Sequence, residues 1–197
     1  QHYNCAFAGI SQGLQRVKFQ AEGCEREYAI SLLGRHQAEN AGVVLMVLSL
    51  LGQTESRLTD KVISDGLRRA VWPGRFEVIS GKPDMIVDGA HNPAGAKALR
   101  RTLDDVYPNR KIVFVLGILA DKDVKGIIDA LVRPEDKVIA VKPDSPRAAD
   151  PAALIDYFQP GQALAAASMA EAVRIAAQLS GPAGVVCVAG SLYQAGA

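Results

Sequence analysis

The chain has 197 residues, of which 49% are hydrophobic and 22% charged, and its formal net charge is +1. This composition is typical of a globular protein with a substantial core, and the near-neutral charge provides no electrostatic footprint for nucleic acid. No apolar run is long enough to span a bilayer and no signal-peptide pattern opens the chain, so we expect no membrane partner. Three cysteines without metal-ligand spacing favour buried thiols in a reducing cytoplasm.

The first seventy or so residues combine short strand patterns with helices. Alternating stretches at 15–20 and 27–32, separated by glycine-containing turns, predict antiparallel strands. The run 35–51 is apolar almost all round, which predicts a buried helix. A shorter helix follows, with Val62, Ile63 and Leu67 on its inner face.

These strands have no obvious partner sheet, so we expect the first part of the chain, 1–72, to be an incomplete domain that starts partway through its fold. The segment Val71-Trp72-Pro73-Gly74 breaks helix into strand and is the natural boundary. The second domain is then 73–197.

From residue 76 onward, strand-like and helical patterns alternate. The predicted strands are 76–80, 85–87, 112–116, 137–141, 162–165 and 184–189. Helical spacing of apolar residues follows Pro93, Asp123, Asp150 and Ser168. Strands that are apolar along their whole length suit a sheet covered on both faces. The predicted fold class is therefore α/β, with an open, mostly parallel, Rossmann-like sheet and helices on both faces.

The segment 84–93 is the most informative stretch for function. A short apolar strand pattern ends in Asp88, followed by a Gly-Ala turn, His91 and Asn92, and Pro93 opens a helix. In a parallel sheet such turns lie at the carboxyl ends of strands, where ligands bind. Capping alone explains the Asn-Pro pair, because Asn is a strong N-cap and Pro suits the first helical position. Capping requires neither the carboxylate nor the imidazole.

Other polar loops follow the remaining strands: 117–123, 142–147 and Gly190-Ser191. Together they mix acidic, basic and hydroxyl groups, which suits a phosphorylated or nucleotide ligand with a metal nearby. The alternative is that Asp123 and Asp150 only cap helices. The chain has no Gly-x-Gly-x-x-Gly fingerprint, no phosphate-cradling Gly-x-x-x-x-Gly-Lys-Ser/Thr loop and no Gly-x-Ser-x-Gly elbow.

Six ordered motifs resemble those of the Mur ligase superfamily, in particular its folylpolyglutamate synthase and dihydrofolate synthase branch. They are Leu33-Gly-Arg-His-Gln-Ala-Glu-Asn-Ala41, Trp72-Pro-Gly-Arg-Phe-Glu77, Asp88-Gly-Ala-His-Asn-Pro93, Gly117-Ile-Leu-Ala-Asp-Lys-Asp123, Ser145-Pro-Arg147 and Ala189-Gly-Ser-Leu-Tyr193. The resemblance runs from about residue 30 to the last residue given. It implies the end of a central ATP-binding domain followed by a C-terminal glutamate ligase domain.

The resemblance implies that ATP phosphorylates a carboxylate of folate or dihydropteroate and that L-glutamate then attacks the acyl phosphate. It also implies that Mg²⁺ offsets the negative charge that builds on the transferred phosphoryl group. In the family the phosphate-binding loop, a magnesium-binding acidic residue and a modified lysine precede the segment matched here. We therefore expect no metal ligands in this chain and no ligase activity from it alone. We also expect the protein to be a monomer. The alternatives are a cell-wall precursor ligase, which the Asp88-Gly-Ala pattern disfavours, and a non-catalytic nucleotide-binding module.

The resemblance also assigns nucleotide contacts. Asn40 would hydrogen-bond the adenine, or else close a helix start. Arg75 would hold the ATP phosphates, or else form an interdomain salt bridge. Asp88 would accept from the ribose hydroxyls, and His91 would lie beside the phosphates. Asn92 would contact the nucleotide or only cap its helix.

Further residues are assigned to catalysis or to the substrate. Lys122 and Asp123 would line the cleft, or would be a solvated lysine and a helix cap. Arg147 would bind the glutamate carboxylate, because a planar guanidinium matches its two oxygens. Ser191 would lie near the reacting groups or would be an N-cap. The expected catalytic set is Arg75, His91 and Ser191.

Overall fold

The structure is a computed structural model, and it describes residues 2–21 and 23–191. The chain divides into two compact units, Gln1–Trp72 and Pro73–Ala197, and the division falls within the 71–74 segment. Each unit has its own core and is described by itself. Within the described residues, no helix is both long enough and apolar enough to cross a membrane.

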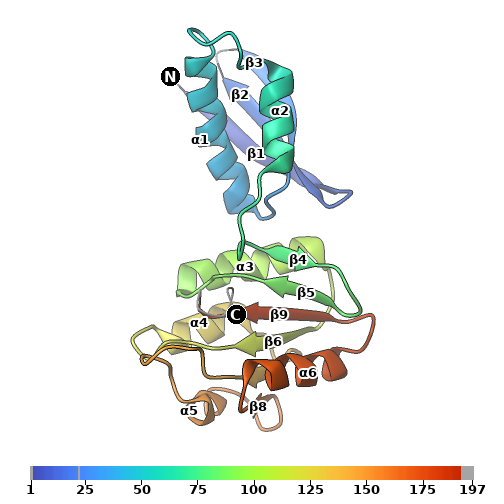
Figure 1. Cartoon of the computed structure of the whole chain (residues 1–197), viewed down its shortest axis with the longest axis vertical. Helices are drawn as coiled ribbons and strands as arrows, with labels where there is room; N and C mark the ends of the chain where they lie inside the picture. The colour runs from blue at the N-terminus through green and yellow to red at the C-terminus, as the bar shows by residue number, and fades with distance from the viewer. Residues whose placement is uncertain (1, 22, 192–197) are drawn as a thin grey trace. The chain divides into compact units, whose positions relative to one another are not determined.

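The first unit is a three-stranded antiparallel sheet with two helices (Figure 1). Its elements are β1 (Tyr3–Ser11), β2 (Leu14–Ala21), β3 (Cys24–Ile30), α1 (Arg35–Leu51) and α2 (Asp60–Arg69). The strands lie in the order β1-β2-β3. The expectation that they lack a partner sheet is therefore wrong, because they pair with one another around a small core of their own.

A buried glutamine fixes the start of α1. Gln15 is fully buried on β2, and its Nε2 donates to the carbonyl of Gly34 at 2.9 Å while its Oε1 accepts from the Gly34 N–H at 2.8 Å. Gly34 precedes the helix with φ of +111°, a conformation that favours glycine. The two bonds leave no polar atom of this buried amide unsatisfied and set where the helix begins.

The prediction of a fully buried α1 is wrong for one face of the helix. Its inner face packs on the sheet through Ala38, Ala41 and Leu45. The outer face leaves large apolar side chains exposed: Val43, Val44, Val47, Leu50 and Leu51. Val62 of α2, expected on the inner face, is also exposed. The physical reason is that this unit offers a single sheet layer, which covers only one side of a two-sided apolar helix.

The second unit is a six-stranded sheet whose order is β4-β5-β9-β6-β7-β8. The strands are β4 (Glu77–Ile79), β5 (Asp84–Val87), β6 (Ile112–Leu116), β7 (Lys137–Ala140), β8 (Ala163–Ala165) and β9 (Val185–Ala189). Only the edge strand β4 is antiparallel to its neighbour, and the other described pairs are parallel. The predicted mostly parallel α/β sheet is confirmed.

The helices of this unit begin directly after their predicted caps. They are α3 (Pro93–Val106), α4 (Val124–Leu131), α5 (Pro151–Ile155) and α6 (Met169–Ser180). The side chains of Asn92, Asp123, Asp150 and Ser168 each accept a backbone N–H of the first turn. Such caps satisfy donors that have no partner within the helix. Asp123 and Asp150 therefore do cap helices.

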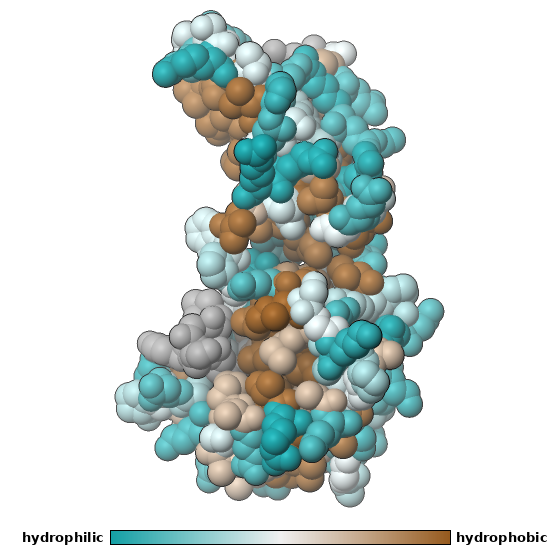
Figure 2. All heavy atoms as spheres, turned by 45° about the vertical axis from the view of Figure 1, so that its right-hand side comes forward, coloured by the Kyte–Doolittle hydropathy of each residue, from teal (hydrophilic) through white to brown (hydrophobic). Residues whose placement is uncertain are grey.

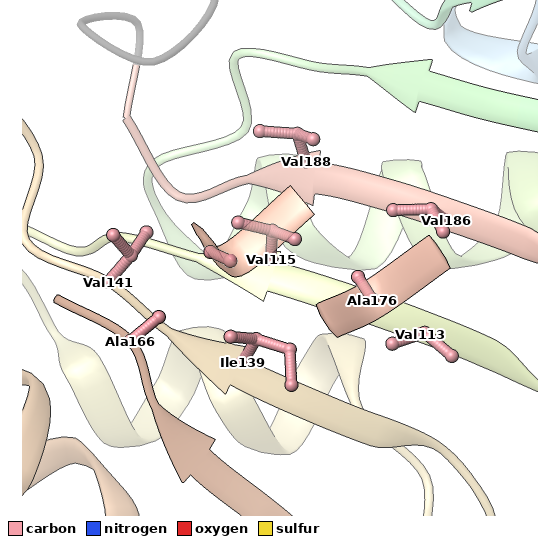
Figure 3. Packing of buried hydrophobic residues seen from close by; sticks show 9 residues of the cluster. Val113, Val115, Ile139, Val141, Ala166, Ala176, Val186 and Val188 are labelled. Atoms are coloured by element: carbon pink, nitrogen blue, oxygen red, sulfur yellow. The ribbon is translucent and has the colours of Figure 1, made fainter. Parts of the chain in front are cut away.

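Helices cover both faces of the sheet: α6 lies on one face, and α3 and α4 lie on the other (Figure 1). Alternate residues of the central strands point toward α6 and form one buried cluster with Ala176, as Figure 3 shows. Ala172 of the same helix belongs to this cluster too. The strand residues of this cluster are Val113, Val115, Ile139, Val186 and Val188, and Val141, just after β7, belongs to it as well. Met85 and Val87 at its margin are only partly buried, and Figure 2 shows hydrophobic surface over the strands on this side.

A buried ion pair lies at the end of the sheet where β6 and β7 begin. Asp136 is 1% exposed, and its carboxylate accepts from Arg100 Nη1 at 2.8 Å, from Ile112 N at 2.9 Å and from Arg133 N at 3.0 Å. Arg100, on α3, also reaches Asp104. One carboxylate thus ties a helix, a strand and a turn together, at the end of the sheet opposite the carboxyl ends of its parallel strands.

The three cysteines lie in different environments. Cys187 is fully buried within β9, and burial raises the pKa of its thiol well above the usual value, with the negative charge of Asp88 adding to the shift. Cys5 is half-buried, and burial raises the pKa of its thiol too. Cys24 is exposed, so the expectation of three buried thiols is wrong at this position, where a strand begins at the edge of the small sheet.

Candidate functional site

Four loops meet at the carboxyl ends of the parallel strands, as predicted. The Gly190 N–H donates to the carbonyl of Ala90 at 3.0 Å, which joins the turn after β5 to the turn after β9. The Gly117 N–H donates to the carbonyl of Ala189 at 3.2 Å and so joins β9 to the turn after β6. These backbone bonds place the loops side by side at the sheet edge where ligands of α/β proteins bind.

The loops after β6 and β7 are also joined to each other. The Ala120 N–H donates to the carbonyl of Arg147 at 2.7 Å, next to an antiparallel bridge between Leu119 and Ala148. The Arg147 guanidinium forms an ion pair with Asp121 through Nη1 and Oδ2 at 3.0 Å. Both side chains are about half exposed. Arg147 is therefore at the predicted sheet edge, where it already binds a carboxylate of its own chain.

Gly190 allows the turns after β9 and β6 to approach closely. Its φ is +105°, and a Cβ built there would lie 2.8 Å from the Gly117 carbonyl oxygen. Both the backbone conformation and the space exclude any larger residue. Glycine at this position is therefore required for the two central loops to lie side by side.

Gly190→Ala is expected to lower the free energy of unfolding by about 2–4 kcal/mol, because a strained φ and an overlap with backbone both act. The measurement is urea denaturation followed by circular dichroism. The matched control is Gly161→Ala, where φ is +76° but no atom lies within 4 Å of the added Cβ. Gly161→Ala carries only the cost of a positive φ. Equal losses of unfolding free energy in the two variants would therefore show that the contact between residue 190 and the Gly117 carbonyl does not affect stability.

Asp88 binds two backbone amides. Its Oδ2 accepts from the Phe76 N–H at 2.8 Å, and its Oδ1 accepts from the Ala90 N–H at 2.8 Å. The carboxylate therefore links the turn after β5 to a segment twelve residues earlier in the sequence. The family resemblance implies a ribose contact for Asp88 but not this bond to Phe76, for which the sequence carries no local signal.

The segment 74–77 is held closely against that turn. The Gly89 N–H donates to the Gly74 carbonyl at 2.8 Å, and the Gly74 N–H donates to Glu77 Oε2 at 3.0 Å. Phe76 is 5% exposed and adopts φ of +46°, which is rare for a bulky residue. Arg75 lies half-buried in the middle of this loop. Its backbone is therefore fixed through both neighbours.

His91 and Asn92 are both oriented by backbone groups. His91 Nδ1 lies 2.8 Å from the carbonyl oxygen of Gly89, and because a carbonyl only accepts, Nδ1 is assigned as the protonated nitrogen. Asn92 Oδ1 accepts from Gly95 N at 2.8 Å and caps α3. The capping interpretation of Asn92 is correct, and the other atoms of its amide can still take part in binding.

Asp123 and Lys122 lie where two helices begin. Asp123 Oδ1 accepts from the Gly126 N–H at 2.9 Å and caps α4. A Cβ on Gly126 would lie 2.9 Å from Cγ of Pro93, the first residue of α3, so the helix N-termini are adjacent. The side chain of Lys122 is half-buried beside them. The site thus combines cationic side chains with two helix N-termini, an arrangement suited to anions.

Comparison with known proteins agrees with this geometry. The domain family described as Mur ligase, glutamate ligase domain, matches residues 74–192, which cover the whole sheet and all four loops. The chain belongs to the Mur ligase family.

The similar proteins of this Mur ligase chain include dihydrofolate synthases and folylpolyglutamate synthases. It is 36% identical over 177 residues to the dihydrofolate synthase/folylpolyglutamate synthase of Mycobacterium tuberculosis, covering 86% of this chain and 36% of that protein. A structure of M. tuberculosis folylpolyglutamate synthase complexed with ADP superposes with a TM-score of 0.84 at 32% identity, over 98% of this chain and 46% of that one. E. coli FolC in complex with DHPP and ADP gives a TM-score of 0.80 at 25% identity, over 98% and 44%. The chain spans less than half the length of these proteins.

In this Mur ligase chain Asn40 belongs to the first unit. It is exposed on α1, and its Nδ2 donates to Gln37 Oε1 at 3.0 Å. Both amides border a largely apolar cavity of about 360 Å³, between α1, α2 and the end of β3, that is also lined by Ile30, Ala41 and Leu67. An apolar pocket with a few polar groups at its rim is the usual form of a small-molecule site.

Ser191 lies two residues after the end of β9 and is 2% exposed. It therefore reaches the sheet edge beside Gly190. Residues 192 and 193, which complete the Ala189–Tyr193 motif, lie outside the described residues, and so does any helix that Ser191 would cap. The sequence placed this serine correctly at the end of the last apolar strand.

Proposed function

We propose that this protein is an ATP-dependent ligase that adds L-glutamate to folate or dihydropteroate. The γ-phosphoryl group of ATP passes to a substrate carboxylate, which gives an acyl phosphate and ADP. The amino group of glutamate then attacks the acyl carbon, loses a proton, and releases phosphate as the amide forms. The observation that carries the proposal is the Asp88–Pro93 turn, joined by backbone bonds to the Gly190 loop within a matched glutamate ligase domain.

The proposed nucleotide contacts follow from the chemistry of the side chains. Arg75 presents a cationic guanidinium suited to phosphate oxygens, and Ser191 adds a hydroxyl. His91 can donate to a phosphate through Nε2 in its imidazolium form, because its Nδ1–H is taken by the Gly89 carbonyl. Asp88, which also holds the amides of Phe76 and Ala90, is the proposed acceptor for the ribose hydroxyls. Asn40 offers an amide to the edge of adenine at the mouth of its apolar cavity. The ADP complexes of similar proteins support this proposal.

We propose that the loops after β6 and β7 bind the incoming glutamate. Arg147 carries a planar guanidinium that matches a carboxylate, and its ion pair with Asp121 is exposed enough to exchange partners. Lys122 adds positive charge, and Asp123, next to it in the loop after β6, would line the site while it caps α4. Asn92 contributes to the nucleotide side in addition to its cap.

The proposed Mg²⁺ takes its main ligands from elsewhere. Among residues 2–21 and 23–191, no group of three or more His, Cys, Asp or Glu side chains is arranged to hold a metal ion. The described residues thus do not fit a metal site by themselves, and their proposed work is to bind phosphate and carboxylate groups. We further propose a monomer that acts in the cytoplasm, where its ATP and glutamate substrates are available.

We propose that residues 1–72 are the C-terminal portion of a central ATP-binding domain and that 73–197 are the glutamate ligase domain. The exposed apolar face of α1 supports the assignment of residues 1–72 to a larger domain, because an apolar helix face is usually buried against other elements. The absence of a phosphate-binding loop from the 197 residues supports the expectation that they lack ligase activity alone.

The test incubates the full-length natural protein with ATP, Mg²⁺, L-glutamate and either dihydropteroate or a folate monoglutamate, and measures amide product by mass spectrometry. We expect product with ATP-dependent release of phosphate, and no product from the 197-residue chain alone. Ligation to nucleotide-sugar peptides instead would favour the cell-wall branch. Nucleotide binding without any ligation would favour a non-catalytic module.

A further inference from the structure

The loop that carries Arg75 is held by two carboxylates that flank it in space. Asp88 accepts the N–H of the residue after Arg75, and Glu77 accepts the N–H of the residue before it. Among the described residues, no hydrogen bond or ion pair engages the Arg75 guanidinium itself. The backbone on either side of this arginine is fixed, while its side chain is left for a ligand.

We propose that Glu77 is a positioning residue that, together with Asp88, holds the Arg75 loop in the conformation that presents the guanidinium to the ATP phosphates. The proposal rests on the phosphate-binding role of Arg75 proposed above. Glu77 is the exposed first residue of the edge strand β4, and the pairing of β4 alone does not require a glutamate there. The proposal gives this residue a function.

The conformation of Phe76 explains why the loop needs two carboxylates. Its φ of +46° is unfavourable for a residue with a Cβ, so the free loop would relax toward an extended backbone. The buried ring and the bond to Asp88 oppose this relaxation on one side of Arg75. The bond from Gly74 to Glu77 closes the loop on the other side.

Releasing either bond would rotate the peptide units next to Arg75. The guanidinium stands at the end of a long side chain, so a small backbone rotation moves it by an ångström or more. Displacements of this size weaken the stabilisation of a transferring phosphoryl group far more than they weaken the fold. If Glu77 positions Arg75, substituting Glu77 should therefore reduce catalysis only while Arg75 is present.

The experiment is a double-mutant cycle in the full-length natural protein, with Glu77→Ala, Arg75→Ala and the combined variant, assayed at varied ATP. We expect Glu77→Ala to lower kcat/KM for ATP by about 10- to 100-fold. In the Arg75→Ala background the same substitution should have little further effect, because the group that it positions is gone. Losses that multiply in the combined variant would overturn the proposal.

Two further variants separate positioning from folding. Glu77→Gln keeps an acceptor for the Gly74 N–H and should retain most activity, whereas Glu135→Ala, an exposed glutamate in the turn before β7, should match the natural protein. A loss with Glu77→Gln equal to that with Glu77→Ala would overturn the hydrogen-bonding role. Thermal unfolding of each variant identifies any that fail to fold.

Hydrogen exchange gives a readout that does not depend on ATP chemistry. The amides of the 73–80 peptide should exchange faster in Glu77→Ala than in the natural protein, and unchanged exchange would overturn the proposal whatever the activity. If Arg75→Ala alone leaves kcat/KM for ATP unchanged, the proposed function of Arg75 fails instead, and the exchange result still reports whether Glu77 holds the loop.

Discussion

Asp136→Ala is expected to lower the free energy of unfolding of the second unit by about 3–5 kcal/mol, because removing one partner of a buried pair leaves the other charge uncompensated. The carboxylate of Asp136 is 1% exposed, and Arg100 opposite it is 9% exposed. The substitution also removes the acceptor for the N–H groups of Ile112 and Arg133. Urea denaturation followed by circular dichroism measures the change.

The control for this substitution is Asp129→Ala, on the surface of α4. Asp129 pairs with Lys125 one helical turn away, and both side chains are more than half exposed. Solvent screens such a pair, so its loss should not measurably shift the urea midpoint. A shift as large as that of Asp136→Ala would mean that burial does not decide the weight of these ion pairs.

If Arg75 holds the ATP phosphates as proposed, Arg75→Ala is expected to lower kcat of the full-length natural protein by about 100- to 1,000-fold, since it would remove a preorganised cation from the transferring phosphoryl group. Arg75→Lys should recover only part of the activity, because a lysine ammonium cannot make the two parallel contacts of a guanidinium. Steady-state assays with saturating L-glutamate and varied ATP provide the measurement.

Arg101→Ala provides a matched loss of charge away from the loops, because Arg101 is an exposed residue of α3. It should leave kcat and the KM for ATP unchanged. A comparable loss in both variants would indicate a general effect of net charge rather than a phosphate contact by Arg75.

The elements of the second unit could be predicted from the sequence because their signals are local. The strand over 112–116 and the caps at Asn92, Asp123 and Ser168 need only apolar runs and short polar side chains, and the structure has them at those positions. The meeting of the loops at one edge followed from the parallel sheet. No knowledge of side-chain contacts was needed for it.

The missed features depend on contacts between distant residues. β1 was not predicted, and its pairing register shifts between Phe7 and Gly9, which interrupts the alternating pattern. The pattern of α1 shows two apolar faces but not which of them this unit covers. The bond from Phe76 to Asp88 and the ion pair of Arg147 with Asp121 join residues 12 and 26 positions apart. Nothing in the sequence indicates that Phe76 adopts a positive φ.

The position of β9 has a consequence for synthesis of the protein. It is the last strand along the described chain, yet it lies between β5 and β6. Without β9, the strands β4 and β5 share no pairing with β6, β7 and β8, so β5 and β6 would each present an unpaired edge. Such edges invite pairing with other chains. We therefore expect the nascent protein to be most prone to aggregation just before β9 joins the two groups of strands, the event that also completes the core and brings the four loops to one edge.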